Sequence, residues 1–274
     1  MSCTPCSRGK KEYKGEYGAH WEARRALQRK RDLMLMQLVD HLDVVTPAVL
    51  VAFLGLDCTP SSLASIGRRL RRLAAAHELN LVTQFDPVLQ QNVTYAVTKE
   101  LNPRQRDTRQ QLAHKLMMAK FWACAEALYP MTDKMKDREL RAAGGLGTCG
   151  IVPDGFCRIG SRNFFLECNG GRDHFDQVVD KAQKYHRHRG SLLDDGNVAA
   201  AIRVIWISKL KGRVAHMVAA FTKIDSDSEG IFKICAEEDF FPQHLSTDTP
   251  FNPFRLTELI FNSSKDGQKH TLVY

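Results

Sequence analysis

IVPDGF, residues 151–156, and FFLECNGG, residues 164–171, are two short apolar runs that each contain a single carboxylate. Runs of this length and composition are typical of buried β-strands. Burying an ionised carboxylate is costly unless a cation or a hydrogen-bond donor accompanies it. If the two runs are neighbouring strands joined by the short turn at residues 158–163, Asp154 and Glu167 lie side by side on one sheet.

Paired carboxylates in this position favour a divalent metal ion. Two like charges so close together must either take up a proton or bind a cation. Carboxylate oxygens are hard ligands that suit Mg²⁺ or Mn²⁺. Such an ion activates water and neutralises the charge that develops on a phosphodiester. We therefore expect Asp154 and Glu167 to form a catalytic metal site.

The helix expected over residues 173–189 supplies a basic group beside this pair. Turned at about 100° per residue, this helix places on its core side Phe175, Val178, Val179, Ala182 and His186. Lys181 and Tyr185 border that side, so Lys181 can lean over the sheet. There it could orient a metal-bound water or stabilise a pentavalent transition state. The alternative is a surface lysine, and periodicity alone does not separate the two.

The segments around the two runs predict a mixed α/β layer. RDTRQQLAHKLMMAKFWACAEALY, which begins at Arg106, reads as a long amphipathic helix, and the Met131-Thr132-Asp133 stretch ends it. After the 173–189 helix, AAIRVIWISK reads as a buried strand and GRVAHMVAAFTKI as a helix. FKICAEEDFF predicts a further strand, followed by irregular structure. Together these segments predict a domain over residues 110–274 with a C-terminal extension.

A different organisation precedes residue 102. A helix pattern, LMLMQLVDHLDVV, starts at Leu33. A second helix is expected to start at Thr46-Pro47, and a third at Thr59-Pro60. NLVTQF and VTYAVTK then read as a β-hairpin. Three helices followed by a hairpin is the order of a winged helix-turn-helix, so residues 33–101 are predicted to be a DNA-binding domain.

The third of these helices divides into an apolar and a basic face. Its apolar side contains Leu63, Ile66, Leu70, Leu73 and His77. Arg68, Arg69, Arg71 and Arg72 fill the opposite side, where they are expected to face solvent together. A recognition helix needs this division, because one face holds it on its domain while the other contacts phosphates and guanine edges. A solvated basic face is the plainer alternative.

Composition agrees with a polyanionic partner. The 274 residues include 39 Lys and Arg against 31 Asp and Glu, which gives a net charge of +8. An excess of this sign favours nucleic acid. Residues 1–32, with nine basic and four acidic side chains, form a basic arm that is expected to turn helical around residues 21–31. This arm is either a solvated tail or a contact for phosphates.

The remaining composition predicts a cytoplasmic protein. No window of the sequence approaches 18 uninterrupted apolar residues, so no membrane insertion is expected. Eight scattered cysteines do not form a disulfide framework. Cys3 and Cys6 form a lone C-x-x-C motif without an evident second pair of zinc ligands.

Several residues in fixed order give the chain a resemblance to a known family. Their order is the one seen in the replication-relaxation family. The residues are, in sequence order, His114, Arg138-Glu139-Leu140, Val152-Pro153-Asp154, the Phe-Phe-Leu-Glu strand ending at Glu167, and Lys181-x-x-x-Tyr185. That family is similar in joining a winged helix to a nuclease fold of the restriction-endonuclease-like PD-(D/E)xK type. MOBC relaxases of mobilisable and conjugative plasmids belong near it. The resemblance covers about residues 33–225.

The resemblance implies specific roles for site residues. Asp154 and Glu167 would be metal ligands, Glu139 would be an additional acidic group, and Lys181 would be the migrated signature lysine. The usual lysine two residues after the glutamate is Asn169 in this chain. Activity therefore depends on Lys181 replacing that lysine, and a catalytically dead DNA-binding descendant remains an alternative.

A second class of relaxase uses a tyrosine nucleophile and three metal-bound histidines. Tyr185-His186-Arg187-His188 supplies these residue types. Arg187 separates the two histidines, however, so the His-hydrophobic-His arrangement is missing, and a basic solvated helix end is the plainer interpretation. This class is expected less than the carboxylate-based one.

Together with the carboxylate pair and the basic charge, the resemblance implies a plasmid relaxase, a metal-dependent endonuclease. It would bind double-stranded plasmid DNA at a transfer origin and nick one strand with Mg²⁺ or Mn²⁺, alongside other relaxosome or coupling proteins. The alternative from another class is a non-catalytic DNA-binding accessory protein or replication regulator with a degenerate nuclease fold.

Overall fold

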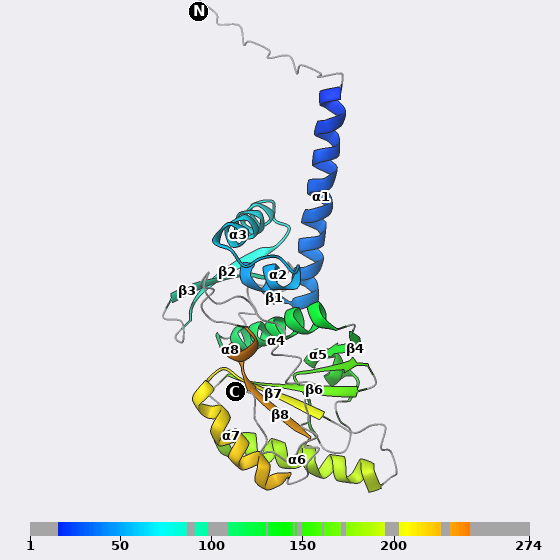
Figure 1. Ribbon diagram of the computed structural model, residues 1–274, viewed down its shortest axis with the longest axis vertical. Coiled ribbons are helices and arrows are strands. Elements are labelled where there is room, and N and C mark those ends of the chain that lie inside the picture. Colours follow the sequence, from blue (N-terminus) through cyan, green and yellow to red (C-terminus); the bar gives the residue numbers. More distant parts are fainter. Residues whose placement is uncertain are drawn as a thin grey trace, which may run out of the picture.

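The computed structural model describes residues 16–86, 91–97, 109–129, 131–144, 146, 150–160, 162–170, 174–194, 203–225 and 231–241. It is a mixed α/β structure with one three-stranded and one five-stranded sheet (Figure 1). This confirms the predicted mixed α/β class. Several predictions concern residues outside this described set. They are the predictions about Cys3 and Cys6, about the segment at residues 98–108, and about the C-terminal extension after residue 241. In the described part of the chain, no helix is long and apolar enough to cross a membrane.

The N-terminal part consists of three helices and a small antiparallel sheet. Its elements are α1 (Glu16–Leu42), β1 (Val44–Val45), α2 (Pro47–Phe53), α3 (Pro60–Ala75), β2 (Asn80–Asp86) and β3 (Gln91–Val97). β3 lies between β1 and β2 and pairs with both. The predicted hairpin is therefore present. The helix expected around residues 21–31 and the one expected from Leu33 form one continuous helix, whose N-terminal end stands away from the other elements (Figure 1).

Local sequence signals set the ends of α2 and α3. Thr46 Oγ1 accepts a hydrogen bond from the Val49 amide, and Thr59 Oγ1 accepts one from the Ser62 amide. A proline follows each threonine at the start of its helix, where no amide donor is needed. α3 ends before His77, which has a φ of 58° and is exposed. The prediction that His77 lies on the core side was wrong, because the helix has already ended there.

The C-terminal part is built around the five-stranded sheet. Its elements are α4 (Arg109–Leu128), β4 (Met131–Lys136), α5 (Asp137–Ala142), β5 (Gly155–Ile159), β6 (Arg162–Asn169), α6 (Phe175–Asp194), β7 (Arg203–Ser208), α7 (Lys211–Ile224), β8 (Phe232–Ala236) and α8 (Glu237–Phe240). The strand order is β4-β5-β6-β7-β8. β4, β5 and β6 pair antiparallel, whereas β6, β7 and β8 pair parallel.

β4 is a strand that the sequence pattern did not predict. Its sequence MTDKMK is charged and only partly buried, and its pairing with β5 is interrupted between Thr132 and Met135. Asp133, inside the interruption, has a φ of 53°. An irregular, charged edge strand lacks the apolar alternation by which strands are recognised.

α4 is buried on nearly every side, so the prediction of an amphipathic helix was wrong. Its buried residues include Leu112, Leu116, Met117, Met118, Ala119, Phe121, Trp122, Ala123, Cys124 and Ala125. The helix packs against α2 of the N-terminal part and against β6 of the large sheet. One hydrophobic cluster consequently runs from α1 through α4 to the sheet.

The two faces of the large sheet are covered by different helices. α4 lies on one face, and α6 and α7 lie on the other (Figure 1). On β6, Phe164, Leu166 and Cys168 belong to the cluster with α4, whereas Phe165 belongs to the cluster with α6 and α7. This alternation follows from the period of two in a strand. It also directs Glu167 toward α6.

The core face of α6 differs from the prediction near the C-terminal end of the helix. Tyr185 is fully buried and His186 is exposed, whereas His186 was predicted to face the core. Val178 and Ala182 are buried as predicted. A tyrosine can be buried when its hydroxyl finds a partner, and Glu167 provides one here.

Candidate active site

Asp154 and Glu167 lie next to each other at one edge of the large sheet. Asp154 directly precedes β5, and Glu167 is near the end of β6. The register pairs Gly155 with Leu166, and the Asp154 amide donates to the Leu166 carbonyl over 3.0 Å. β4, β6, β7 and β8 all end at this edge, since β4 runs in the same direction as β6. Ligand sites commonly lie beyond the carboxyl ends of strands in α/β sheets.

Each oxygen of the Asp154 carboxylate has a partner. Oδ1 is 3.2 Å from His114 Nε2 of α4, and Oδ2 accepts a 2.7 Å hydrogen bond from the Cys168 amide. Burial opposes ionisation of Asp154, but the bond and the charge of His114 outweigh it and lower the Asp154 pKa. Burial also disfavours the protonated form of His114. The hydrogen bond to Asp154 and the negative charge of Asp154 outweigh this effect, so the pKa of His114 is raised.

Glu167 is 3% exposed and receives two hydrogen bonds from α6. Lys181 Nζ donates to Oε2 over 2.5 Å, and the Tyr185 hydroxyl donates to Oε1 over 2.6 Å. Burial, and next the negative charge of Asp154, raise the pKa of Glu167 to about 8, even though Lys181 and Tyr185 act in the opposite direction. Burial and the Glu167 charge also raise the pKa of Tyr185. The two carboxylates therefore interact electrostatically.

Gly155 allows α4 to approach the site. A Cβ atom on this residue would lie 2.5 Å from Met118 Cε and 3.1 Å from Trp122 Cζ2. β5 can therefore pack directly against α4, which carries His114 one turn before Met118. The Pro-Asp-Gly sequence at 153–155 thus combines the carboxylate with the small residue that brings its histidine partner within reach.

Glu139 is not brought to the carboxylate pair. It is exposed, and its Oε2 accepts a 2.7 Å hydrogen bond from the Lys136 amide at the start of α5. This contact stabilises the helix N-terminus. Asp137 is the α5 carboxylate whose charge acts on His114. Among the residues that the structure describes, no group of three or more His, Cys, Asp or Glu side chains could hold a metal ion.

The donor chemistry of the pair nevertheless fits a small divalent cation. Each carboxylate oxygen has more than one acceptor direction, so the protein contacts leave lone pairs for a ligand. Mg²⁺ commonly uses one or two carboxylates and completes its octahedron with water and substrate phosphate. Asp154 and Glu167 could supply two such ligands. His114 and Lys181 stand beside them as cationic or hydrogen-bonding groups.

The site is accessible from the side of its basic residues. The His114 and Lys181 side chains are each 32% exposed and that of Asp154 is 19% exposed, whereas that of Glu167 is only 4% exposed. A substrate therefore meets the two basic groups and Asp154 before Glu167. This order suits an anionic substrate.

The four arginines of α3 do not form one solvent-facing set. Arg69 Nε is 2.7 Å from Asp32 Oδ1 of α1, and Arg72 Nη2 is 3.1 Å from the same oxygen. The Arg69 side chain is only 19% exposed. Arg68, Arg71 and Arg72 are exposed. The helical pattern could not reveal this division, because Asp32 comes from a distant element.

Tyr185 and His186 of the sequence Tyr185-His186-Arg187-His188 have different surroundings. Tyr185 is buried against Glu167, while His186 is exposed and lies 4.0 Å from Asp225 Oδ1. A tyrosine in this position cannot attack a phosphate without leaving the core. The arrangement gives no support to a tyrosine-nucleophile site here.

Three site features were missed from the sequence, and the first is the contact between His114 and Asp154. The Tyr185–Glu167 bond was not expected, although a helical tyrosine four residues after Lys181 is a usable signal. The role of Asp137 was also missed, and no local pattern reveals it. A comparison with family models, curated proteins and solved structures found no match for this chain.

Proposed function

We propose that this chain is a metal-dependent DNA endonuclease that nicks one strand of plasmid DNA at a transfer origin. The observation that carries the proposal is the position of Asp154 beside Glu167 at the strand edge, with Lys181 bonded to Glu167. This arrangement is what the resemblance to replication-relaxation proteins leads one to expect. The basic charge of the chain supports a nucleic-acid substrate.

The N-terminal part would locate the DNA. Three helices followed by an antiparallel hairpin agree with a winged helix-turn-helix in which α3 is the recognition helix. Arg68 and Arg71 are exposed on α3 and would contact phosphates or guanine edges. The C-terminal part would be the PD-(D/E)xK nuclease-like domain, with Lys181 in the role of the lysine that Asn169 replaces.

In this mechanism, Asp154 and Glu167 would hold Mg²⁺ or Mn²⁺, which when bound supplies Lewis-acid activation of water and of the scissile phosphate. Asp154 is suited to the task because its lowered pKa keeps it ionised. Lys181 would leave Glu167 for the phosphate or for the attacking water, since its ammonium stabilises developing negative charge. His114 would orient Asp154 and could exchange a proton with water at the exposed side of the site. Glu139 would remain outside this set.

Nicking of supercoiled plasmid tests the proposal. Supercoiled DNA that carries the cognate origin would be incubated with the full chain and Mg²⁺ or Mn²⁺, and open circles would be counted on a gel. Asp154→Asn and Glu167→Gln should each reduce the nicking rate by on the order of 100-fold or more. Glu139→Gln should stay close to the parent. If no divalent ion produces open circles from cognate DNA, the enzyme assignment fails.

One observation favours a second function, a DNA-binding protein without nuclease activity. Both oxygens of Glu167 are already bonded to protein donors. Lys181 and Tyr185 would then take the place of a metal ion at Glu167, and the fold would be stable without the metal. In that case the parent chain would bind the origin and retard its migration, and the Asp154 and Glu167 variants would bind it equally well.

A further inference from the structure

The N-terminal half of α1 extends past α3 and away from both sheets (Figure 1). Within residues 19–31 of this helix, every residue is exposed except Gln28, which is half-buried. A helical segment of this length without tertiary contacts is only marginally stable in water. A partner that binds along the segment would therefore stabilise it.

This half of α1 is strongly basic. Residues 19–31 contain one Glu and five Lys or Arg side chains, which are Arg24, Arg25, Arg29, Lys30 and Arg31. Among the residues that the structure describes, none of these five cations has an ion-pair partner. We propose that this segment binds the phosphate backbone of duplex DNA, next to the base pairs that α3 would contact. The choice of DNA as the polyanion rests on the proposed function.

One side of α1 faces α3. Asp32 lies on this side, because its Oδ1 is 2.7 Å from Arg69 Nε and 3.1 Å from Arg72 Nη2 of α3. Gln28, one turn earlier, is half-buried on the same side. Arg24 and Arg25 precede Gln28 by four and three residues, so they continue this side toward the N-terminus. At about 100° per residue, Lys30 lies on the opposite side of the helix.

Arg24 and Arg25 are placed to meet the DNA that α3 would bind. Arg25 lies about 10 Å from Asp32 along the helix axis, which is about three nucleotide steps of one DNA strand. A duplex that lies against the exposed side of α3 would thus bring neighbouring phosphates to these two arginines. The Arg25 guanidinium stacks 5.3 Å from the centre of the Trp21 ring. This cation–π contact holds the guanidinium in place, so less side-chain freedom is lost when it binds a phosphate.

The apolar side chains of α1 do not favour a second copy of this chain as the partner. Trp21, Leu27 and Leu33 are 59%, 49% and 54% exposed. At about 100° per residue they lie on three different sides of the helix, about 120° apart. A seam between two helices needs its apolar residues on one side. A second copy would also bring like charges together, whereas a phosphate backbone complements them.

The salt dependence of binding to a mixed-sequence duplex tests this contact, because backbone contacts do not depend on base sequence. Binding would be followed by fluorescence anisotropy without divalent ions. Arg24→Gln and Arg25→Gln should each reduce the slope of log K against log salt by about 0.9, the value for one lost phosphate contact. Lys30→Gln removes the same charge from the opposite side of α1 and should retain the parent slope. Equal slopes in the parent and all three variants would overturn the contact.

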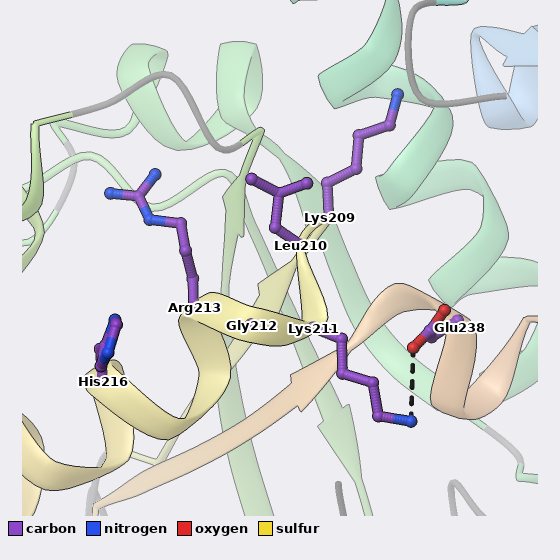
Figure 2. A pocket seen from close by; sticks show the side chains of 7 residues that line it. All are labelled: Lys209, Leu210, Lys211, Gly212, Arg213, His216 and Glu238. Atoms are coloured by element: carbon purple, nitrogen blue, oxygen red, sulfur yellow. Dashed lines mark ion pairs between the residues drawn. The ribbon is translucent and has the colours of Figure 1, made fainter. Parts of the chain in front are cut away.

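A second control separates local contacts from net charge. Lys211 lines a pocket at the start of α7 and pairs with Glu238 over 3.4 Å (Figure 2). Lys211→Gln lowers the net charge by the same amount as Arg25→Gln, but at a position where the charge already has a partner. Its slope should equal that of the parent. A reduction as large as that of Arg25→Gln would assign the effect to net charge and overturn the contact at α1.

Trp21 gives an independent measurement of what covers this side of α1. The chain has three tryptophans, and Trp122 and Trp206 are each only 2% exposed. Acrylamide quenching of tryptophan fluorescence therefore reports mainly on Trp21. Saturating duplex should reduce the quenching, and dilution of the free chain should not change it. If duplex leaves the quenching unchanged, the DNA contact is overturned, and quenching that rises on dilution would identify a second copy of the chain as the partner.

The outcome is separable from that of the proposed nuclease activity. A chain whose salt slope falls in Arg24→Gln and Arg25→Gln, but which never nicks plasmid, retains this contact and loses the nuclease assignment. A chain that nicks cognate plasmid while both variants keep the parent slope retains the nuclease assignment and loses the contact at α1.

Discussion

At the scale of single residues, the pKa of Glu167 reflects the electrostatics of the site. Its carboxyl is buried, faces another carboxylate and has a pKa raised to about 8. Lys181 and Tyr185 reduce the cost of its ionisation without removing it. A group held in this state is sensitive both to pH and to a nearby cation, and groups of this kind cluster at functional sites.

The raised pKa of Glu167 predicts that the metal-free chain becomes less stable as pH rises. Between the ordinary value of 4.5 and about 8, the folded chain binds a proton at Glu167 that the unfolded chain does not. The free energy of unfolding from this group therefore falls as pH increases across that window. The raised pKa of His114 acts in the same direction.

Thermal unfolding in EDTA at pH 5.5 and pH 8 measures this effect. Glu167→Gln should show a smaller decrease in melting temperature between the two pH values than the parent does. Glu22→Gln, an exposed substitution on α1, serves as the control and should behave as the parent. A Glu167→Gln variant whose decrease equals that of the parent would assign the pH dependence to other groups.

At the scale of elements, the structure depends on how closely β5 packs against α4. Gly155 is the point of contact, since the Met118 and Trp122 side chains occupy the space that a Cβ would need. The same contact sets the position of His114 beside Asp154. Packing and the geometry of the site are therefore linked through one glycine.

Gly155→Ala is expected to destabilise the fold by about 1–3 kcal/mol, because the added methyl group overpacks the contact with α4. Denaturant unfolding measures this change. Gly212→Ala introduces the same methyl group into open space within a helix and should be neutral or stabilising. The cost of Gly155→Ala combined with Met118→Ala should be smaller than the sum of the costs of the two single substitutions, and additive costs would place the strain elsewhere.

Elements with a local signal were predictable, and those fixed by distant contacts were not. Thr46-Pro47 and Thr59-Pro60 identified two helix starts, and the apolar runs identified β6, β7 and β8. The strand expected over residues 151–156 was wrong in its bounds, because β5 begins only at Gly155 and continues to Ile159, into the segment predicted as a turn. β4 was missed because its edge position permits a charged sequence. The amphipathic character assigned to α4 was wrong because two separate parts of the chain cover it. At the site, the adjacency of Asp154 and Glu167 followed from strand pairing, whereas the bonds to His114 and Tyr185 depend on helix packing.

At the scale of the whole molecule, α4 is shared by the N-terminal elements and the large sheet. It packs against α2 on one side and β6 on the other. Ion pairs extend the connection, since His41 of α1 and Lys134 of β4 both contact Glu126 of α4. The proposed DNA-binding part and the proposed nuclease part would thus be held in one orientation by a common helix.

The arginines of α3 should divide into two classes in DNA binding. Arg68→Ala and Arg71→Ala should each weaken duplex binding and reduce its salt slope by about 0.9, because each loses an exposed phosphate contact. Arg69→Ala should mainly reduce stability, since it removes the part-buried partner of Asp32. Fluorescence anisotropy and denaturant unfolding of the three variants measure both effects. An unchanged salt slope in both Arg68→Ala and Arg71→Ala would move the DNA-binding surface away from α3.

Binding of Mn²⁺ to the full chain, followed by electron paramagnetic resonance, tests the central claim most directly. The parent should bind one Mn²⁺ at the strand edge, more tightly at pH 8 than at pH 6, since the metal requires ionised carboxylates. Asp154→Asn and Glu167→Gln should each abolish this binding, and Glu139→Gln should retain it. Equal binding by the parent and both site variants would contradict a metal site formed by Asp154 and Glu167.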